Sequence, residues 1–109
     1  MRLNVVTKHA VPADTREYAE QKLHRLERHA SVQEASLTVD RDLALVPEAS
    51  AEILVHIHHT VLTARCEAAN VREAIDGAID KADEQVRRLQ ERVTDRKGRV
   101  GADALPPRS

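Results

Sequence analysis

The stretch from Asn70 to Arg96, NVREAIDGAIDKADEQVRRLQERVTDR, decides the fold because it carries the most regular apolar pattern in the chain. Its apolar side chains follow the period of an α-helix, about 3.6 residues. They are Val71, Ala74, Ile75, Ala78, Ile79, Ala82, Val86, Leu89 and Val93. Asn70 followed by Glu73 has the spacing of a helix-capping box, and Gly98 and Gly101 favour a helix end. The pattern predicts one long amphipathic helix whose apolar face packs on another element.

Upstream of this helix, four segments alternate apolar and polar side chains, which is typical of half-buried strands. These segments are residues 2–8, 32–41, 51–58 and 61–68. The last two are joined by the short connection His58-His59-Thr60 and therefore predict a hairpin. Residues 42–48 between the middle segments predict a loop.

Residues 14–29 follow a helical period instead. Asp14 stands three residues before Glu17, which predicts a second capping box with Asp14 as the cap. The expected apolar stripe consists of Tyr18, Ala19, Leu23, Leu26 and Ala30, and Lys22, Arg25 and Arg28 lie off it. The segment predicts a second amphipathic helix with cations beside its buried face.

The order is therefore β-α-β-β-β-α, and it predicts an α+β domain. A two-layer sandwich with two helices on one face of a four-stranded mixed sheet buries every apolar face at once. The first two strands are expected to be parallel with a right-handed crossover, and the others antiparallel. The length of 109 residues fits a single domain. We expect this domain over residues 1–97 and a disordered tail over residues 98–109.

Composition excludes several classes of protein. The chain has no apolar run of about 18 residues, so no membrane span is predicted. Its N-terminus lacks the apolar core of a signal peptide, and Cys66 is its one cysteine, so a cytoplasmic location is expected. Without Phe or Trp, it cannot build an aromatic platform that stacks RNA bases.

The net charge of −1 hides an uneven distribution. Residues 32–69 contain two basic and six acidic residues, a balance of −4, whereas residues 85–99 contain six basic and two acidic residues, a balance of +4. Lys81, Arg88 and Arg92 share one helical face, which the cations of the first helix are expected to extend. One interpretation is complementarity to the helix dipole. The other is a surface that binds phosphates without aromatic side chains.

Three stretches give the chain a family resemblance. They are residues 1–5, residues 11–12 with 16–18 and 22–28, and residues 67–81 with Gln85. The third, EAANVREAIDGAIDK, is the most specific and is similar to the family pattern E-a-x-D-x-Y-A-A-I-D-x-x-x-D-K-L-x-x-Q. The chain resembles the ribosome hibernation factors, namely the hibernation-promoting factor and ribosome-associated inhibitor A family, also described as sigma-54 modulation or S30EA-type proteins. It departs from the pattern at Arg72, where an aromatic residue is usual, and at Glu84, where basic residues are common.

The resemblance implies a cytoplasmic, non-enzymatic protein without cofactor, metal or small-molecule substrate. Such proteins bind the 30S subunit or 70S ribosome at 16S rRNA in the decoding channel, block the mRNA and tRNA sites, and protect idle ribosomes under stress and in stationary phase. A monomer is expected off the ribosome, and the chain resembles a short family member or the first domain of a long one. By matching position, the implied rRNA contacts are Lys22, Arg25, Arg28, Lys81, Arg88 and Arg92.

Other features allow other interpretations. His56, His58 and His59 suggest a metal site, but no further ligand follows at suitable spacing, so solvent-facing histidines are favoured. Cys66 lies on the expected inward strand face, so a core role is favoured over a nucleophile. The alternative to ribosome binding is a protein–protein interaction module that uses the acidic sheet face or an exposed strand edge.

Overall fold

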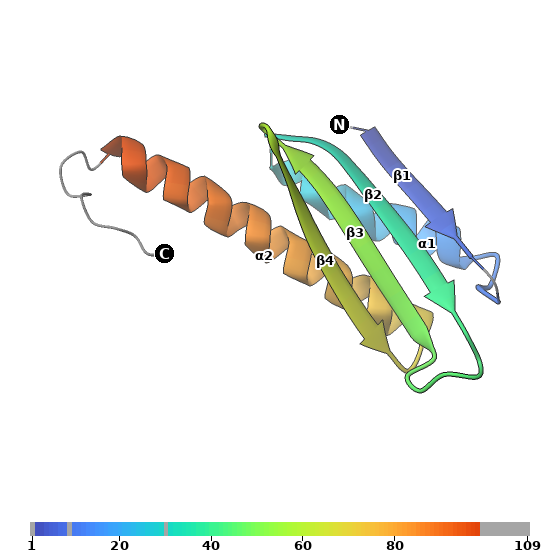
Figure 1. Ribbon diagram of the computed structural model, residues 1–109. Coiled ribbons are helices and arrows are strands. Elements are labelled where there is room, and N and C mark those ends of the chain that lie inside the picture. Colours follow the sequence, from blue (N-terminus) through green and yellow to red (C-terminus); the bar gives the residue numbers. More distant parts are fainter. Residues whose placement is uncertain (1, 9, 30, 99–109) are drawn as a thin grey trace.

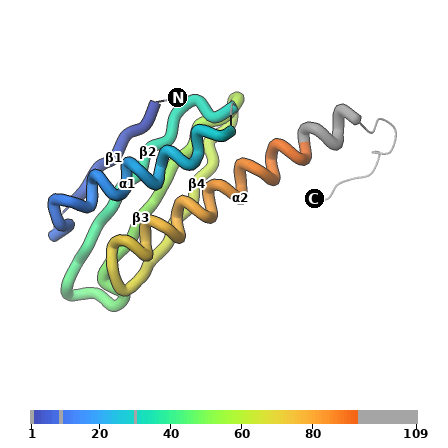
Figure 2. Tube along the Cα trace, turned by 180° about the vertical axis from the view of Figure 1, so that it is seen from behind, coloured from blue at the N-terminus to red at the C-terminus, as the bar shows by residue number. Residues whose placement is uncertain are grey.

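The alternating segments form one four-stranded sheet, and both helices pack on the same face of it (Figure 1, Figure 2). The computed structural model describes residues 2–8, 10–29 and 31–98, with side chains as far as Arg92. The elements are β1 (Arg2–Thr7), α1 (Thr15–Leu23), the 3₁₀-helix η1 (His24–Arg28), β2 (Val32–Arg41), β3 (Ala49–Ile57), β4 (Thr60–Ala68) and α2 (Val71–Gly98).

The strand order is β1-β2-β3-β4, with β1 parallel to β2 and the other two pairs antiparallel. This arrangement confirms the predicted α+β class and the mixed sheet. The inward side chains of the strands meet the apolar stripes of the two helices in one core. Its largest fully buried side chains are Leu23, Leu26, Leu37, Ile53, Ile57, Ile75, Ile79, Val39, Val55 and Val86.

The first helix differs from its prediction in two ways. It ends at Leu23 and continues as η1, and because three residues make a 3₁₀ turn, Leu23 and Leu26 lie on the same side and are both fully buried. Asp14 directly precedes the helix as predicted, but the predicted capping box is not formed. Asp14 has helical backbone angles and makes no capping bond, and its carboxylate lies 3.7 Å from Arg72 instead. Ala30, which was expected on the stripe, is outside the described residues.

The second helix follows its prediction closely. The backbone N–H of Glu73 donates to Asn70 Oδ1 at 2.9 Å, so Asn70 is the cap. The helix continues to Gly98, and its last turns project past the end of the sheet (Figure 1). Gly98, the first residue of the predicted tail, belongs to α2, and the rest of that predicted tail, residues 99–109, is outside the described residues. None of the described helices combines the length and the apolar character needed to cross a membrane.

Candidate nucleic-acid interface

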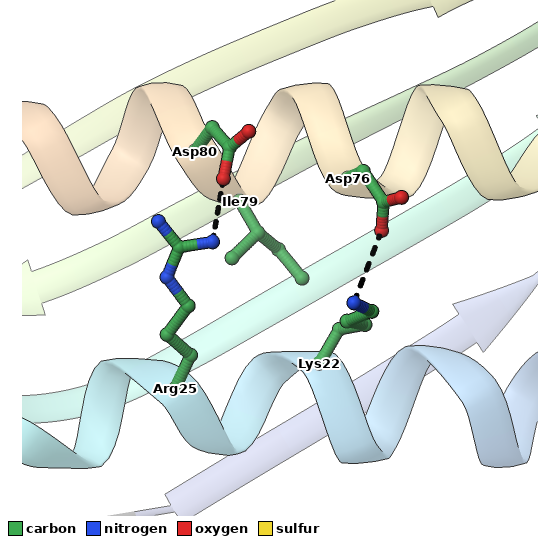
Figure 3. A pocket seen from close by; sticks show the side chains of 5 residues that line it. All are labelled: Lys22, Arg25, Asp76, Ile79 and Asp80. Atoms are coloured by element: carbon green, nitrogen blue, oxygen red, sulfur yellow. Dashed lines mark hydrogen bonds and ion pairs between the residues drawn. The ribbon is translucent and has the colours of Figure 1, made fainter.

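The cations of α1 and η1 face the carboxylates of α2 across a line of ion pairs, which we call the helix seam (Figure 3). The pairs are Lys22–Asp76 at 3.9 Å, Arg25–Asp80 at 2.5 Å, Arg25–Asp83 at 3.5 Å and Arg28–Asp83. The hydrogen bond to Asp80 raises the pKa of Arg25, although burial opposes the shift. The seam therefore joins the helices with three cations matched to three carboxylates, and no excess positive charge is left there.

A small hollow opens between the helices along this seam. It has a volume of about 160 Å³ and is lined by Lys22, Arg25, Asp76, Ile79 and Asp80. Small-molecule sites typically enclose roughly 300–1,000 Å³ and are mostly apolar. The hollow is smaller and its lining is mostly charged, so it is part of the ion-pair network rather than a ligand pocket.

Asp83 forms the buried end of the helix seam. Its side chain is only 8% exposed, and one carboxylate oxygen lies 2.7 Å from Nε2 of the buried His29. Burial raises the pKa of Asp83, but the hydrogen bonds from His29 and Arg28 and their charges outweigh it, so the pKa is lowered overall. Asp83 is thus held as a carboxylate. Its contacts from α2 to Arg28 and His29 are not indicated by the sequence.

Tyr18 closes the other end of the seam. Its hydroxyl donates to Asp76 at 2.7 Å, and burial together with this bond to a carboxylate raises the pKa of the phenol. The Arg72 guanidinium lies 4.6 Å and the Lys22 ammonium 5.5 Å from the centroid of the ring. Arg72, at the position where the family pattern has an aromatic residue, therefore stacks on the ring of the one tyrosine.

The remaining predicted contacts lie on the opposite side of α2, which we call the β4 flank and define as Lys81, Gln85, Arg88 and Arg92. Lys81 Nζ donates to the Arg65 carbonyl of β4 at 2.9 Å, and Gln85 Nε2 donates to the Thr63 carbonyl at 3.1 Å. Arg88 pairs with Glu84 one turn before it at 2.7 Å. Within the described part of the chain, Arg92 is exposed and makes no ion pair.

The six predicted residues therefore do not form one surface. The expectation that Lys22, Arg25 and Arg28 extend the face of Lys81, Arg88 and Arg92 is wrong, because α2 lies between the two sets. Helix α1 packs on β1 and against one side of α2, whereas β4 packs along the other side of α2. A sequence pattern places residues on a helix face but does not show which neighbour that face meets.

The balance of charge differs between the two sides. The β4 flank has three cations, and among the described carboxylates only that of Glu84 pairs with one of them, Arg88. Arg87, which was not among the predicted contacts, is also exposed and makes no ion pair with any described side chain. Among the cations of α2 whose side chains the structure describes, Lys81, Arg87 and Arg92 are therefore not neutralised by an ion pair.

The histidines of the β3–β4 hairpin are exposed. His56 lies on the face of the sheet away from the helices, and His58 has a left-handed backbone with φ of 57° at the turn. Among the residues that the structure describes, no group of three or more His, Cys, Asp or Glu side chains is arranged to hold a metal ion. Cys66 is half-buried on the inward face of β4, as predicted.

Comparison with known proteins places this geometry in a family. The model of the family described as sigma 54 modulation protein / S30EA ribosomal protein matches residues 3–94. No curated protein matches the sequence significantly.

Two solved structures are similar to the chain. The N-terminal domain of Protein Y from Thermus thermophilus has a TM-score of 0.67 and 29% identity, and the match covers 82% of this chain and 99% of that one. A ribosomal subunit interface protein from Coxiella burnetii has the same fold, with a TM-score of 0.71 and 15% identity over 84% of this chain and 99% of that one. Because the family model spans nearly all the described residues, the chain belongs to the sigma 54 modulation and S30EA ribosomal protein family.

Proposed function

We propose that the chain is a ribosome hibernation factor that binds 16S rRNA of the small subunit in the decoding channel. In this role it covers the mRNA and tRNA sites, blocks translation and protects idle ribosomes under stress. The observation that carries the proposal is the family match over residues 3–94, and the fold shared with the Protein Y domain supports it. The family is one of ribosome-associated factors rather than enzymes, and the proposed location is the cytoplasm.

We propose that phosphates of the RNA bind first to the β4 flank. Lys81, Arg88 and Arg92 are exposed, and Lys81 uses one of its three donors on the Arg65 carbonyl. A phosphate can approach these cations without separating them from a buried carboxylate. Binding then gains free energy from release of counterions, which requires neither aromatic side chains nor base contacts.

The cations of the helix seam are proposed to contribute less to RNA binding than those of the β4 flank. Arg28 shares the buried carboxylate of Asp83, and Arg25 pairs with Asp80 as well. An RNA phosphate must compete with these carboxylates, and separating a cation from a buried partner costs free energy. We propose that Lys22, Arg25 and Arg28 contact rRNA only through the donors that point away from α2.

The alternative is that the chain is a protein–protein interaction module. The β4 edge of the sheet limits how such a module could bind a partner. The outward carbonyls of Thr63 and Arg65 on β4 are occupied by the side chains of Gln85 and Lys81. Strand addition needs such carbonyls free, so pairing of another strand along β4 is disfavoured. The open sheet face, with Glu34 and Glu52 on it, stays available to this alternative.

Cosedimentation tests the proposal directly. The purified protein is mixed with small subunits or with 70S ribosomes and centrifuged through sucrose gradients at moderate salt. We expect it to travel with the small subunit and with 70S, and to stay at the top with large subunits alone. Protein that stays at the top in every gradient would refute ribosome binding and favour the interaction module.

A competition experiment tests the proposed position. Small subunits that already carry mRNA and initiator tRNA are presented with the protein, and empty subunits serve as the control. We expect much weaker binding to the loaded subunits, because the sites are shared. Equal binding to loaded and empty subunits would place the protein outside the decoding channel.

A further inference from the structure

The loop between β2 and β3, residues 42–48, holds three large apolar side chains in solvent. Leu43 is 64% exposed, Leu45 58% and Val46 98%. Single exposed apolar residues are ordinary, but three within four positions of one loop indicate a contact surface. The core of the domain gains nothing from them, because the strands on both sides fill it with their own inward residues.

Hydrogen bonds fix the conformation of this loop. The Asp42 N–H donates to the Glu48 carbonyl at 2.8 Å, and the Leu45 N–H donates to the Asp42 carbonyl at 3.0 Å. The Asp42 side chain accepts the Ala44 N–H at 3.0 Å. The loop is therefore held in shape before any partner arrives, which reduces the entropy lost on binding.

An ion pair closes the base of the loop and sets its charge. Arg41 Nε lies 2.9 Å from Glu48 Oε2. Residues 40–48 contain three carboxylates and one cation, a balance of −2. Beside the loop, a hollow of about 420 Å³ is lined by Ala10, Asp40, Arg41, Asp42, Leu43 and Ala44. The surface thus combines an apolar tip, an adjacent recess and an acidic border.

This chemistry selects one kind of partner. Carboxylates repel RNA phosphates, and aliphatic side chains form neither stacking nor hydrogen bonds with bases. A second copy of the loop would bring like charges together. We propose that residues 42–48 dock on a basic protein surface with an apolar recess, and that this surface belongs to a protein of the small ribosomal subunit.

The proposal extends the proposed ribosome binding and rests on it. The loop lies at one end of the sheet, whereas the last turns of α2 project from the other end (Figure 1, Figure 2). The β4 flank begins at Lys81, beside Arg65 of β4, and follows α2 away from the loop, so contact with rRNA through the flank leaves the loop able to reach a different component (Figure 1). Two separate contacts, one with RNA and one with protein, add their binding energies within one complex.

Photo-cross-linking identifies what lies against the loop. A benzophenone amino acid replaces Leu45 in the full chain, which is bound to purified small subunits and irradiated. The matched control carries the same group at Leu54, an apolar residue on the open sheet face. We expect position 45 to give a cross-link that resists ribonuclease and is lost on protease treatment, with one basic protein as its partner. A cross-link to RNA or to a second copy, or none from a bound chain, would overturn the proposal.

Variants measure the contribution of the loop. The test variant is L43S/L45S/V46S, and the control, from exposed apolar residues of the open sheet face, is V6S/L54S/V61S. We expect the loop variant to bind small subunits about tenfold more weakly with an unchanged salt dependence, and the control to bind like the parent chain. Equal binding by the loop variant and the parent chain would refute loop docking alone. Absence of binding by the parent chain would refute the proposed function itself.

Discussion

Gly77 of α2 lies directly against Cys66 of β4. A β-carbon placed on Gly77 would lie 2.3 Å from the Cys66 Sγ and 3.1 Å from its Cβ. Non-bonded atoms do not approach so closely, so glycine is the residue that allows the helix to lie near the strand at this point. The same approach brings Lys81 and Gln85, one and two turns later, within hydrogen-bonding distance of the β4 carbonyls.

Gly77→Ala is expected to destabilise the fold although alanine favours helices. Helix propensity alone gives alanine an advantage of about 1 kcal/mol, whereas overpacking costs about 1–3 kcal/mol. Cys66→Ala removes the clashing sulfur, so the double variant should lose less stability than the sum of the single variants. Urea unfolding of the four proteins in this cycle measures the coupling. If the losses of stability of the two single variants add up in the double variant, α2 moves away from β4 at little cost and the close contact is not what requires glycine.

Asn70→Ala is expected to lower the unfolding free energy by about 1 kcal/mol, because it removes the cap bond to the Glu73 N–H. Asp14→Ala is the matched control. Asp14 makes no capping bond, and its pair with Arg72 is exposed, so its loss should cost less than about 0.5 kcal/mol. Thermal unfolding of the two variants compares them. A larger loss for the Asp14 variant would contradict the cap assignment.

The different outcomes at Asn70 and Asp14 show what the sequence predicts well and what it does not. The period of α2 and the alternation of β2 and β3 depend on neighbours along the chain, so their elements were predicted within about two residues. Asp14 and Asn70 have the same spacing to a glutamate, but capping also needs an extended backbone at the first residue. Asp14 instead has φ of −76° and ψ of −7°, in a turn that follows Pro12. That backbone geometry is not written in the residue spacing.

The candidate site was less predictable than the fold. The six proposed contacts follow from residue type and spacing, but the partners of Lys22, Arg25, Arg28 and Lys81 come from other elements. Arg28 and His29 meet Asp83 from 55 and 54 residues away, and Lys81 meets the Arg65 carbonyl of β4. Such long-range pairing depends on how α1 and β4 pack around α2. The sequence therefore predicts the presence of positive charge, and the structure shows how much of it is neutralised.

Asp83→Asn is expected to destabilise the protein by about 2 kcal/mol. The carboxylate is 8% exposed and bound by His29 and Arg28, and removal of one partner leaves buried polar groups incompletely satisfied. Asp80→Asn is the control, because Asp80 is 60% exposed and its pair with Arg25 is at the surface. That variant should lose less than about 0.5 kcal/mol in urea unfolding. Equal losses would mean that Asp83 is not the main anchor of the seam.

The lowered pKa of Asp83 predicts how the difference in unfolding free energy between the parent chain and Asp83→Asn depends on pH. The folded-state pKa is lowered from the ordinary value of 3.8, so the unfolded chain takes up the proton first as the solution is acidified. The carboxylate therefore stabilises the fold fully above that value, and the contribution is lost as pH falls through the folded-state pKa. The gap between the parent chain and Asp83→Asn should be constant near neutrality and narrow below about pH 4. A gap that widens in acid would contradict the lowered pKa.

Charge reversal on the β4 flank is expected to weaken ribosome binding and to change its salt dependence. The test variant is K81E/R88E/R92E, and the control, with the same change of charge but on the opposite sheet face, is R2E/K8E/R65E. Each lost phosphate contact reduces the slope of log K against log salt by about 0.7–0.9, so the test variant should lose about two units or more. Filter binding to small subunits at several salt concentrations measures the slope, and circular dichroism verifies the fold. If the salt dependence of binding falls in the control variant and is unchanged in the test variant, rRNA binds the open face of the sheet.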